Sequence, residues 1–283
     1  MGRARPGRAA PAPALTAALA LTLVPVGVSG QVPLGSPSTR GQTVTPAFEG
    51  WYENPDGTFT ISFGYYNRNS GETIDIPLGE NNTIEPAEFN GGQPTRFEPE
   101  RHWGVFGVVV PSDFGDREVV WTLKNGGKEF PIPGSLRDAW QIDALEGEAG
   151  TGNTPPVVKF DAAGPEAQGP LGVFGPPLTA SVGAPLELHV WASDDGRGGG
   201  SVVWASRNVT VSLAWIEHQG PGEVTFASPT AKVAPAGGEA TTLATFSEPG
   251  EYIVRVRAND SPVASAGHAQ CCWTNAYVKI TVR

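Results

Sequence analysis

Two adjacent cysteines, Cys271 and Cys272, are the only cysteines in this 283-residue chain, and they are the residues best suited to unusual chemistry. Three states compete for them: a vicinal disulfide, two thiols that bind a soft metal together with His268, or a bridge between two chains. Because no second spaced pair of cysteines is present, the metal motif is weak, and the sequence favours a structural or redox-passive role.

A second candidate for chemistry is a set of carboxylates, Asp194, Asp195 and Asp260, which the strand pattern places at strand ends. Carboxylates gathered at one end of a β-sandwich can hold Ca²⁺ through oxygen ligands. Asp also suits turns for purely local reasons, and the chain has no D-x-D-x-D-G series with a distal Glu. We therefore expect turn roles and no cofactor, with Ca²⁺ or a soft metal as the alternatives.

Exposed aromatic side chains form a third candidate, because they can stack on sugar faces. Adjacent aromatics in a strand point to opposite faces, so at least one of Tyr65 and Tyr66 should be exposed. Ordinary core or edge packing is the competing explanation for the whole set. The set comprises Trp51, Tyr52, Tyr65, Tyr66 and Trp103 in the first half of the chain, and Trp191 and Trp204 in the second.

Local signatures of the common enzyme classes are missing from the sequence. No G-x-S-x-G elbow, P-loop or dinucleotide-binding glycine motif is present, and no two histidines have metal-ligand spacing. We therefore expect a protein without a catalytic centre. Most of the four histidines are expected to face solvent; they are His102, His189, His218 and His268.

The composition describes a turn-rich β protein with an acidic balance. Gly (37) and Pro (27) are abundant, and charged residues make up only 17% of the chain. Lys, Glu, Leu and Met are scarce while Val, Thr, Gly and Pro are plentiful, so long helices are not expected. The net charge of -10 argues against a nucleic-acid partner, since phosphate binding needs a basic face.

Residues 1–30 have the layout of a secretory signal peptide. Arg3, Arg5 and Arg8 precede an apolar stretch at residues 14–24, and Pro25 then ends it before a run of small residues. That stretch is shorter than a membrane span requires. We therefore expect cleavage, no stable membrane insertion afterwards, and a periplasmic, cell-surface or secreted product.

Period-two alternation in the rest of the chain predicts an all-β protein of two β-sandwich domains. After a flexible lead-in at residues 31–45, residues 46–146 form the first sandwich, which opens with a hairpin around Asn54-Pro55-Asp56-Gly57. A Gly/Pro-rich linker containing one edge strand covers residues 147–177. Four strongly alternating segments then predict a second sandwich over residues 178–283.

The second sandwich resembles the PKD-type, immunoglobulin-like domains of bacterial exported proteins. The resemblance rests on ATFSEPGEYIVRVRAND at residues 244–260, VGAPLEL at 182–188 with ASDD at 192–195, and VSLAW at 211–215, where Trp215 matches the buried strand tryptophan. The long insertion after Gly196 departs from that pattern. The first sandwich is more loosely similar to bacterial surface modules through residues 63–69, 76–82, 92–97 and 119–123.

Such modules are structural or adhesive, so the resemblance implies fold more than function. Together these observations predict a non-catalytic exported interaction or structural protein of the bacterial envelope or exterior, with a protein or a glycan as its partner. One alternative is a carbohydrate-binding accessory module that uses the exposed aromatics. Another is a small redox or metal-binding protein centred on Cys271 and Cys272.

Overall fold

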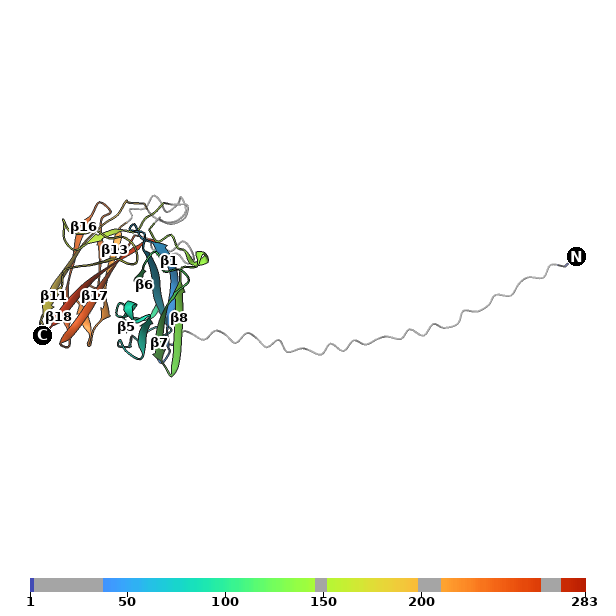
Figure 1. Cartoon of the computed structure of the whole chain (residues 1–283), viewed down its shortest axis with the longest axis horizontal. Helices are drawn as coiled ribbons and strands as arrows, with labels where there is room; N and C mark the ends of the chain where they lie inside the picture. The colour runs from blue at the N-terminus through green and yellow to red at the C-terminus, as the bar shows by residue number, and fades with distance from the viewer. Residues whose placement is uncertain (3–37, 146–151, 198–209, 261–270) are drawn as a thin grey trace. The chain divides into compact units, whose positions relative to one another are not determined.

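The computed structural model describes residues 1–2, 38–145, 152–197, 210–260 and 271–283. In these residues the regular structure is β apart from two short 3-10 helices, η1 (Ala87–Phe89) and η2 (Asp138–Trp140) (Figure 1). No helix in this part of the chain is long and apolar enough to cross a membrane. Contacts divide the chain into Met1–Ser36 and Pro37–Arg283, and all elements below belong to the second unit.

The predicted N-terminal hairpin is present. Strands β1 (Val44–Glu53) and β2 (Phe59–Asn67) are antiparallel, and the turn between them contains Gly57 at φ +80°. Glycine adopts this left-handed conformation without steric cost. Asp56 Oδ1 accepts a hydrogen bond from the Thr58 amide at 3.0 Å, which closes the turn locally.

Two small sheets face each other in the first sandwich and enclose an aromatic core. Phe63 of the first sheet stacks on Phe106 at 5.5 Å, and both rings contact Trp121 of the second sheet. Trp121 donates its indole N–H to Asn82 Oδ1 at 3.0 Å, so its one polar atom is satisfied in the core. The first sheet contains β1, β2 and β6 (Glu100–Val110), and the second contains β4 (Asn82–Glu85), β7 (Glu118–Asn125) and β8 (Lys128–Ser135). A separate two-stranded ribbon consists of β3 (Ile74–Asp75) and β5 (Arg96–Phe97).

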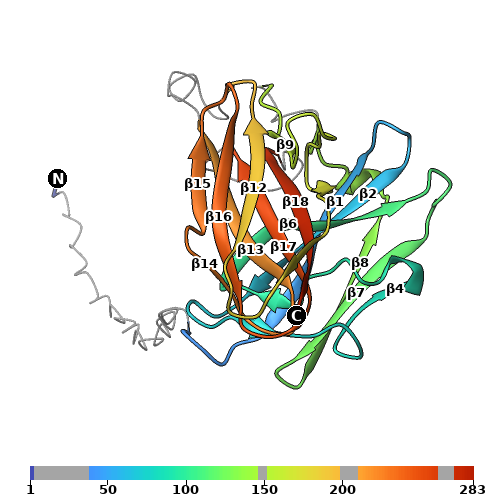
Figure 2. The ribbon, with the colours of Figure 1, turned by 90° about the vertical axis from the view of Figure 1, so that its left-hand side faces the viewer.

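The second sandwich contains a four-stranded and a six-stranded sheet, which Figure 2 shows as two layers. The four-stranded sheet has the order β14 (Val224–Phe226), β16 (Gly238–Phe246), β12 (Leu186–Ser193) and β9 (Val157–Lys159). The six-stranded sheet has the order β10 (Val173–Phe174), β18 (Trp273–Val282), β17 (Gly250–Asn259), β13 (Val211–Gln219) and β15 (Thr230–Val233), with β11 (Leu178–Ala180) parallel to β18.

This pairing is that of an immunoglobulin-like sandwich, in which strands B and E share one sheet and strands C, F and G share the other. Trp215 on β13 is buried at the position of the strand C tryptophan. Tyr252 at the start of β17 donates its hydroxyl to the Glu248 carbonyl at 2.9 Å, which is the tyrosine corner of the fold. The all-β, sandwich prediction is therefore confirmed.

Residues 147–177 contribute to both sheets of the second sandwich. β9 lies at the edge of the four-stranded sheet, where Val158 is buried, and β10 extends the six-stranded sheet along β18. The described part of the predicted linker is therefore packed against the sandwich. Its Gly and Pro residues lie in the turns and extended connections between these short strands. Their abundance therefore does not make the segment a flexible linker.

Along β17 and β18, the outer face of the six-stranded sheet is buried by the first sandwich. Asn275 Nδ2 and Trp273 Nε1 donate to the Gly104 carbonyl at 2.7 and 3.3 Å. The Tyr277 hydroxyl and Arg255 Nη1 donate to the next carbonyl along β6, that of Val105, at 2.9 and 3.1 Å. Residues Trp273–Val278 are consequently buried on both faces of β18, so the two sandwiches share one polar interface.

Gly104 is essential to this interface, and we expect Gly104→Ala to lower the free energy of unfolding by about 2–4 kcal/mol. A Cβ at this position would overlap the Trp273 ring, and the backbone has a φ of +45°. Chemical denaturation followed by intrinsic tryptophan fluorescence measures the change.

The matched control for this prediction is Gly127→Ala. Gly127 also has a positive φ, of +70°, but no neighbouring atom lies within 4 Å of the position that a Cβ would take. It therefore carries only the backbone cost of about 1 kcal/mol. Equal destabilisation by the two substitutions would contradict the close approach at Gly104.

Candidate functional site

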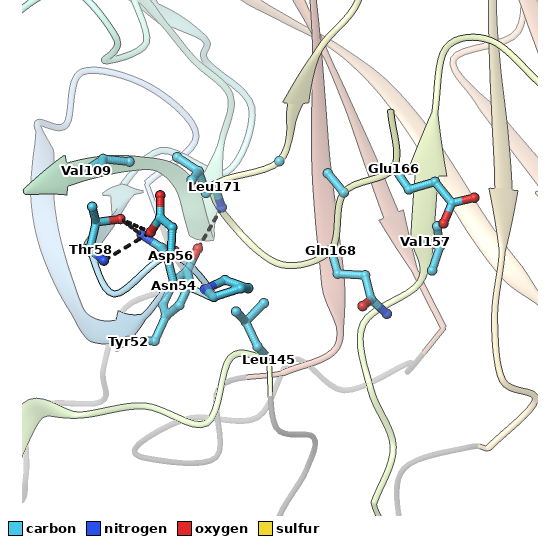
Figure 3. Close-up of a pocket in the computed structure, with 13 residues that line it drawn as sticks. Tyr52, Asn54, Asp56, Thr58, Val109, Leu145, Val157, Glu166, Gln168 and Leu171 are labelled. Carbon is cyan, nitrogen blue, oxygen red and sulfur yellow. Dashed lines mark hydrogen bonds between the residues drawn. The ribbon is translucent and has the colours of Figure 1, made fainter. Parts of the chain in front are cut away.

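A cleft of about 600 Å³ opens between the β1–β2 turn and the segment that enters the second sandwich (Figure 3). The turn supplies polar residues, and the entering segment supplies an amide, a carboxylate and two leucines. Val109 of β6 is 41% exposed on the cleft surface. The lining residues used below are Tyr52, Asp56, Val109, Leu145, Glu166, Gln168 and Leu171.

Tyr52 holds the two walls of the cleft together. Its hydroxyl accepts a hydrogen bond from the Leu171 amide at 3.0 Å, across 119 residues of sequence. Its ring is buried with Ile142 and Ala144, and burial raises the pKa of the phenol to about 12. Tyr52 is therefore a structural clamp and does not offer a ring face to a ligand.

The cleft has a carboxylate on each wall. Hydrogen bonds from Thr58 lower the pKa of Asp56, so this carboxylate is ionised at neutral pH. Glu166 lies on the opposite wall (Figure 3). It pairs with Lys159 at 3.2 Å. Gln168 is held by a 2.8 Å hydrogen bond from its Nε2 to the Pro155 carbonyl. The arrangement can accept hydrogen bonds from hydroxyl, amide or cationic groups.

Three of the seven predicted sugar-stacking aromatics are buried. Trp51, Tyr52 and Tyr65 are 8%, 3% and 1% exposed, whereas Tyr66 is 42% exposed. The opposite placement of Tyr65 and Tyr66 follows the predicted alternation. Trp51 donates to the Arg137 carbonyl and Tyr65 accepts from the Glu98 amide, which explains why each is retained in a buried position.

The other three aromatic candidates are two partly buried tryptophans and one tryptophan outside the described residues. Trp103 is partly buried beneath the Arg101 guanidinium, which lies 3.8 Å from its ring centroid. Trp191 is also partly buried and packs on His189 at 4.8 Å. Trp204 lies outside the described residues.

Two exposed aromatics were missed at the sequence level, Trp140 and Phe174, which are 51% and 53% exposed. Trp140 ends the 3-10 helix η2 and packs on Phe48, and Phe174 stacks on Tyr277 at 5.0 Å. Neither lies in a long alternating segment, so period-two patterning carries no signal about their exposure.

Cys271 and Cys272 are joined in a vicinal disulfide, with Cα atoms 3.4 Å apart. Both residues are buried, and their Sγ atoms lie 3.3 and 3.2 Å from the Asn153 carbonyl oxygen. A disulfide offers no thiolate for a soft metal, so the predicted metal centre requires a reduced form. His268 lies outside the described residues.

Of the three aspartates considered as calcium ligands, two lie together and the third makes a different contact. Asp194 and Asp260 contact each other, and burial followed by the charge of Asp194 raises the pKa of Asp260 to about 8. Asp195 instead accepts a hydrogen bond from the Arg197 amide at 2.8 Å. Among the described residues, no three carboxylate, histidine or cysteine side chains form a metal-binding group.

The expectation that most of the histidines face solvent is wrong for the three that the structure describes, because only His189 is exposed. His218 is 2% exposed and contacts the Gly92 carbonyl at 2.9 Å, and His102 contacts the Pro99 carbonyl at 3.0 Å. Burial, aided by the charge of Arg255, lowers their pKa values to about 3 and about 4 respectively. Burial between the sandwiches overrides the usual exposure of His, whereas His189 remains exposed.

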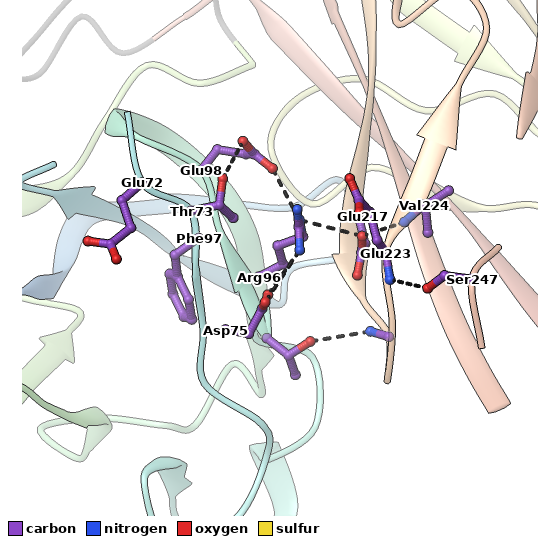
Figure 4. Close-up of polar contacts among 12 residues, drawn as sticks. Glu72, Thr73, Asp75, Arg96, Phe97, Glu98, Glu217, Glu223, Val224 and Ser247 are labelled. Atoms are coloured by element: carbon purple, nitrogen blue, oxygen red, sulfur yellow. Dashed lines mark hydrogen bonds and ion pairs between the residues drawn. The ribbon is translucent and has the colours of Figure 1, made fainter. Parts of the chain in front are cut away.

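An acidic cluster around Arg96 lies where β5 of the first sandwich meets β13 of the second (Figure 4). Arg96 contacts Asp75 and Glu98 at 3.3 Å and Glu217 at 3.5 Å. The single guanidinium of Arg96 therefore forms ion pairs with three carboxylates. Burial raises the pKa of Glu217 to about 7, against the opposing effects of the Val224 amide and of Arg96.

Comparisons with known proteins give weak structural similarities only. No family model matches the chain, and no curated protein matches it. WR4, an MSP family member of Caenorhabditis elegans, is 8% identical with a TM-score of 0.23 over 37% of this chain and 92% of its own. Domains 4 and 5 of the S-layer protein SbsC are 11% identical, with a TM-score of 0.24 over 77% and 89% of the two chains. The D00-D0 domain of intimin is 12% identical, with a TM-score of 0.25 over 84% and 100%.

The raised pKa of Glu217 predicts a pH-dependent interface. Between pH 4.5 and about 7, folded protein retains a proton that the unfolded chain has released, so this contribution to stability falls as the pH rises. Glu217→Gln should therefore gain stability relative to wild type across this window, by at most about 3 kcal/mol.

Denaturation of both proteins at pH 4.5, 6 and 8 measures this difference. Asp260 acts in the same direction as Glu217, whereas His102 and His218 act in the opposite direction below pH 6.5. These three groups are present in both proteins, so the difference isolates Glu217. A difference that does not vary with pH would show that Glu217 is ionised throughout.

The vicinal disulfide predicts a protein whose mass is two hydrogens below that of the chain with two thiols. It also predicts that the folded protein resists reduction. We expect alkylation after reductant only when denaturant is also present, because both sulfurs are buried. Intact mass with and without denaturant measures this, and elemental analysis of the same sample tests for metal. Two thiols in the untreated protein, or a stoichiometric metal, would favour the metal-binding alternative.

Proposed function

We propose that this chain is a non-catalytic exported binding protein in which two β-sandwiches are held together to present a preformed cleft. The partner is a glycan or a segment of another protein. The cleft carries the proposal, because its walls come from both parts of the chain and are fixed by internal hydrogen bonds. A binding surface that is ordered before the ligand arrives loses less entropy on binding.

The lining of the cleft suits a polar ligand with an apolar side. Leu145, Leu171 and the exposed Val109 supply apolar surface, while Asp56 and Gln168 supply hydrogen-bonding groups. The hydroxyl groups of a sugar, or a lysine or arginine of a peptide, would donate to the two carboxylates. A few oriented polar groups on an apolar surface are typical of ligand sites.

A carbohydrate-binding function at a second groove is favoured by the position of Trp191. Trp191 lines a groove of about 400 Å³ together with Lys159, Ser193 and Glu239. Its indole is held by the His189 ring, and His189 pairs with Glu239 at 3.3 Å. An oriented, partly exposed tryptophan beside charged side chains can stack on a sugar and bond its hydroxyls.

Export and the PKD-type assignment belong to this proposal as well. The basic and apolar pattern of residues 1–30 supports export, and the acidic surface suits a soluble product. The buried Trp215 and the Tyr252 corner support an immunoglobulin-like domain in the general sense. The motif at residues 244–260 is what favours the PKD type among such domains.

Filling the cleft should abolish binding without unfolding the protein. Val109→Trp adds bulk at a position that is already 41% exposed, and we expect at least a tenfold loss of affinity for any ligand of the cleft. A glycan array and a phage-displayed peptide library are screened with wild-type protein, and each hit is then measured with both proteins by calorimetry.

The matched control is Leu243→Trp, because Leu243 is a 45% exposed aliphatic residue on β16 and does not line the cleft. We expect its affinities to equal those of wild type. Unchanged binding by Val109→Trp, or no hit for wild-type protein in either library, would refute binding at the cleft.

A further inference from the structure

A cationic groove lies on the face of β13, β15 and β17, away from the cleft residues described above. Strand register sets its layout: Ala214 is paired with Arg257 and with Thr230, and Ser212 is paired with Asn259 and with Lys232. Paired residues in antiparallel strands point to the same face. The six side chains therefore form two adjacent rows of three on one side of the sheet.

The shape of the groove follows from side-chain size along these rows. The central strand contributes only Ala214 and Ser212, whereas the flanking strands contribute the longer Arg257 and Lys232 at diagonal corners. Neighbouring strands lie about 4.8 Å apart, so both cationic heads can reach over the central strand. The resulting groove has a volume of about 520 Å³, and these residues line it together with Thr230.

The charge of the groove is unbalanced within the described residues. Arg257 and Lys232 line it, no Asp or Glu does, and neither cation has an ion pair in this part of the chain. Arg257 is partly buried, and its Nε lacks a hydrogen-bond partner among the described residues. Its neighbour on the same face, Arg255, adds a second positive charge and lowers the pKa of Arg257 further after the effect of burial.

A partly buried guanidinium that has no ion pair and an unbonded Nε among the described residues is unfavourable, so an anion that binds there can supply the missing charge and hydrogen bond. A planar carboxylate or a sulfate matches the donor geometry of arginine. The hydroxyl of Thr230 is exposed beside the cations. It can bond to a neutral hydroxyl group of the same ligand.

We propose that this groove binds an acidic sugar, whose carboxylate or sulfate group lies between Arg257 and Lys232. The ring hydroxyls bond to Thr230. This site is separate from the cleft of the proposed function and does not depend on it. In a chain with a net charge of -10, it is a local positive surface that selects anions the rest of the surface repels.

Replacing Ser212 tests the proposal without truncating either cation. Ser212→Asp places a carboxylate in the central strand, where it can pair with Arg257 and Lys232 and occupy the anion position. Ser212→Asn has the same size without the charge and is the matched control. Because Ser212 is exposed, neither change should disturb the core.

Calorimetry at low ionic strength uses four probes: a uronic acid trisaccharide, a sulfated trisaccharide, a neutral trisaccharide and a tetraglutamate peptide. We expect wild type and Ser212→Asn to bind at least one acidic trisaccharide with affinities within twofold of each other. Ser212→Asp and Lys232→Gln should bind it at least five times more weakly, and the neutral sugar should not bind. Which acidic sugar binds distinguishes carboxylate from sulfate.

The thermal midpoint of Ser212→Asp supplies a readout that does not need a ligand. It should exceed that of Ser212→Asn, because the new carboxylate neutralises two like charges. Absence of binding by both acidic trisaccharides, equal binding by Ser212→Asp, or tetraglutamate binding at least as tight as the sugars would overturn the proposal.

Discussion

The two carbonyl groups of Gly104 and Val105 organise this molecule, because they accept hydrogen bonds from four side chains of the second sandwich. Arg255, Trp273, Asn275 and Tyr277 all donate to them. These donors lie on the outer face of a sheet that an isolated immunoglobulin-like domain would expose to water. Once they are buried, each must keep its partner, so the first sandwich is held in one position on the second.

The cleft and the perturbed ionisable groups both follow from that interface. Tyr52 can reach the Leu171 amide only because the second sandwich brings the entering segment alongside β1 and β6. His218 and Glu217 lose water because β13 meets the first sandwich. Burial shifts the two pKa values in opposite directions: it keeps the His218 imidazole neutral in acid and keeps the Glu217 carboxyl protonated nearly to neutral pH.

The two candidate binding surfaces carry opposite charges and therefore suit different ligands. The cleft presents the carboxylates of Asp56 and Glu166, and the groove on β13, β15 and β17 presents Arg257 and Lys232. These two surfaces are suited to different chemical groups, donors in one case and anions in the other. The disulfide and Asp260 are buried, which fits structural roles better than exchange with solvent.

The sequence by itself determined the all-β class, the hairpin around Gly57, the strands of the second sandwich and the opposite placement of Tyr65 and Tyr66. These follow from local rules of turn geometry and period-two alternation, which act within a few residues. Only the tertiary structure decided that Arg255 and His218 are buried and that Trp140 is exposed. The physical reason is that alternation separates the two faces of a strand but does not say what covers the second face. Here that cover comes from residues as many as 172 positions away along the chain.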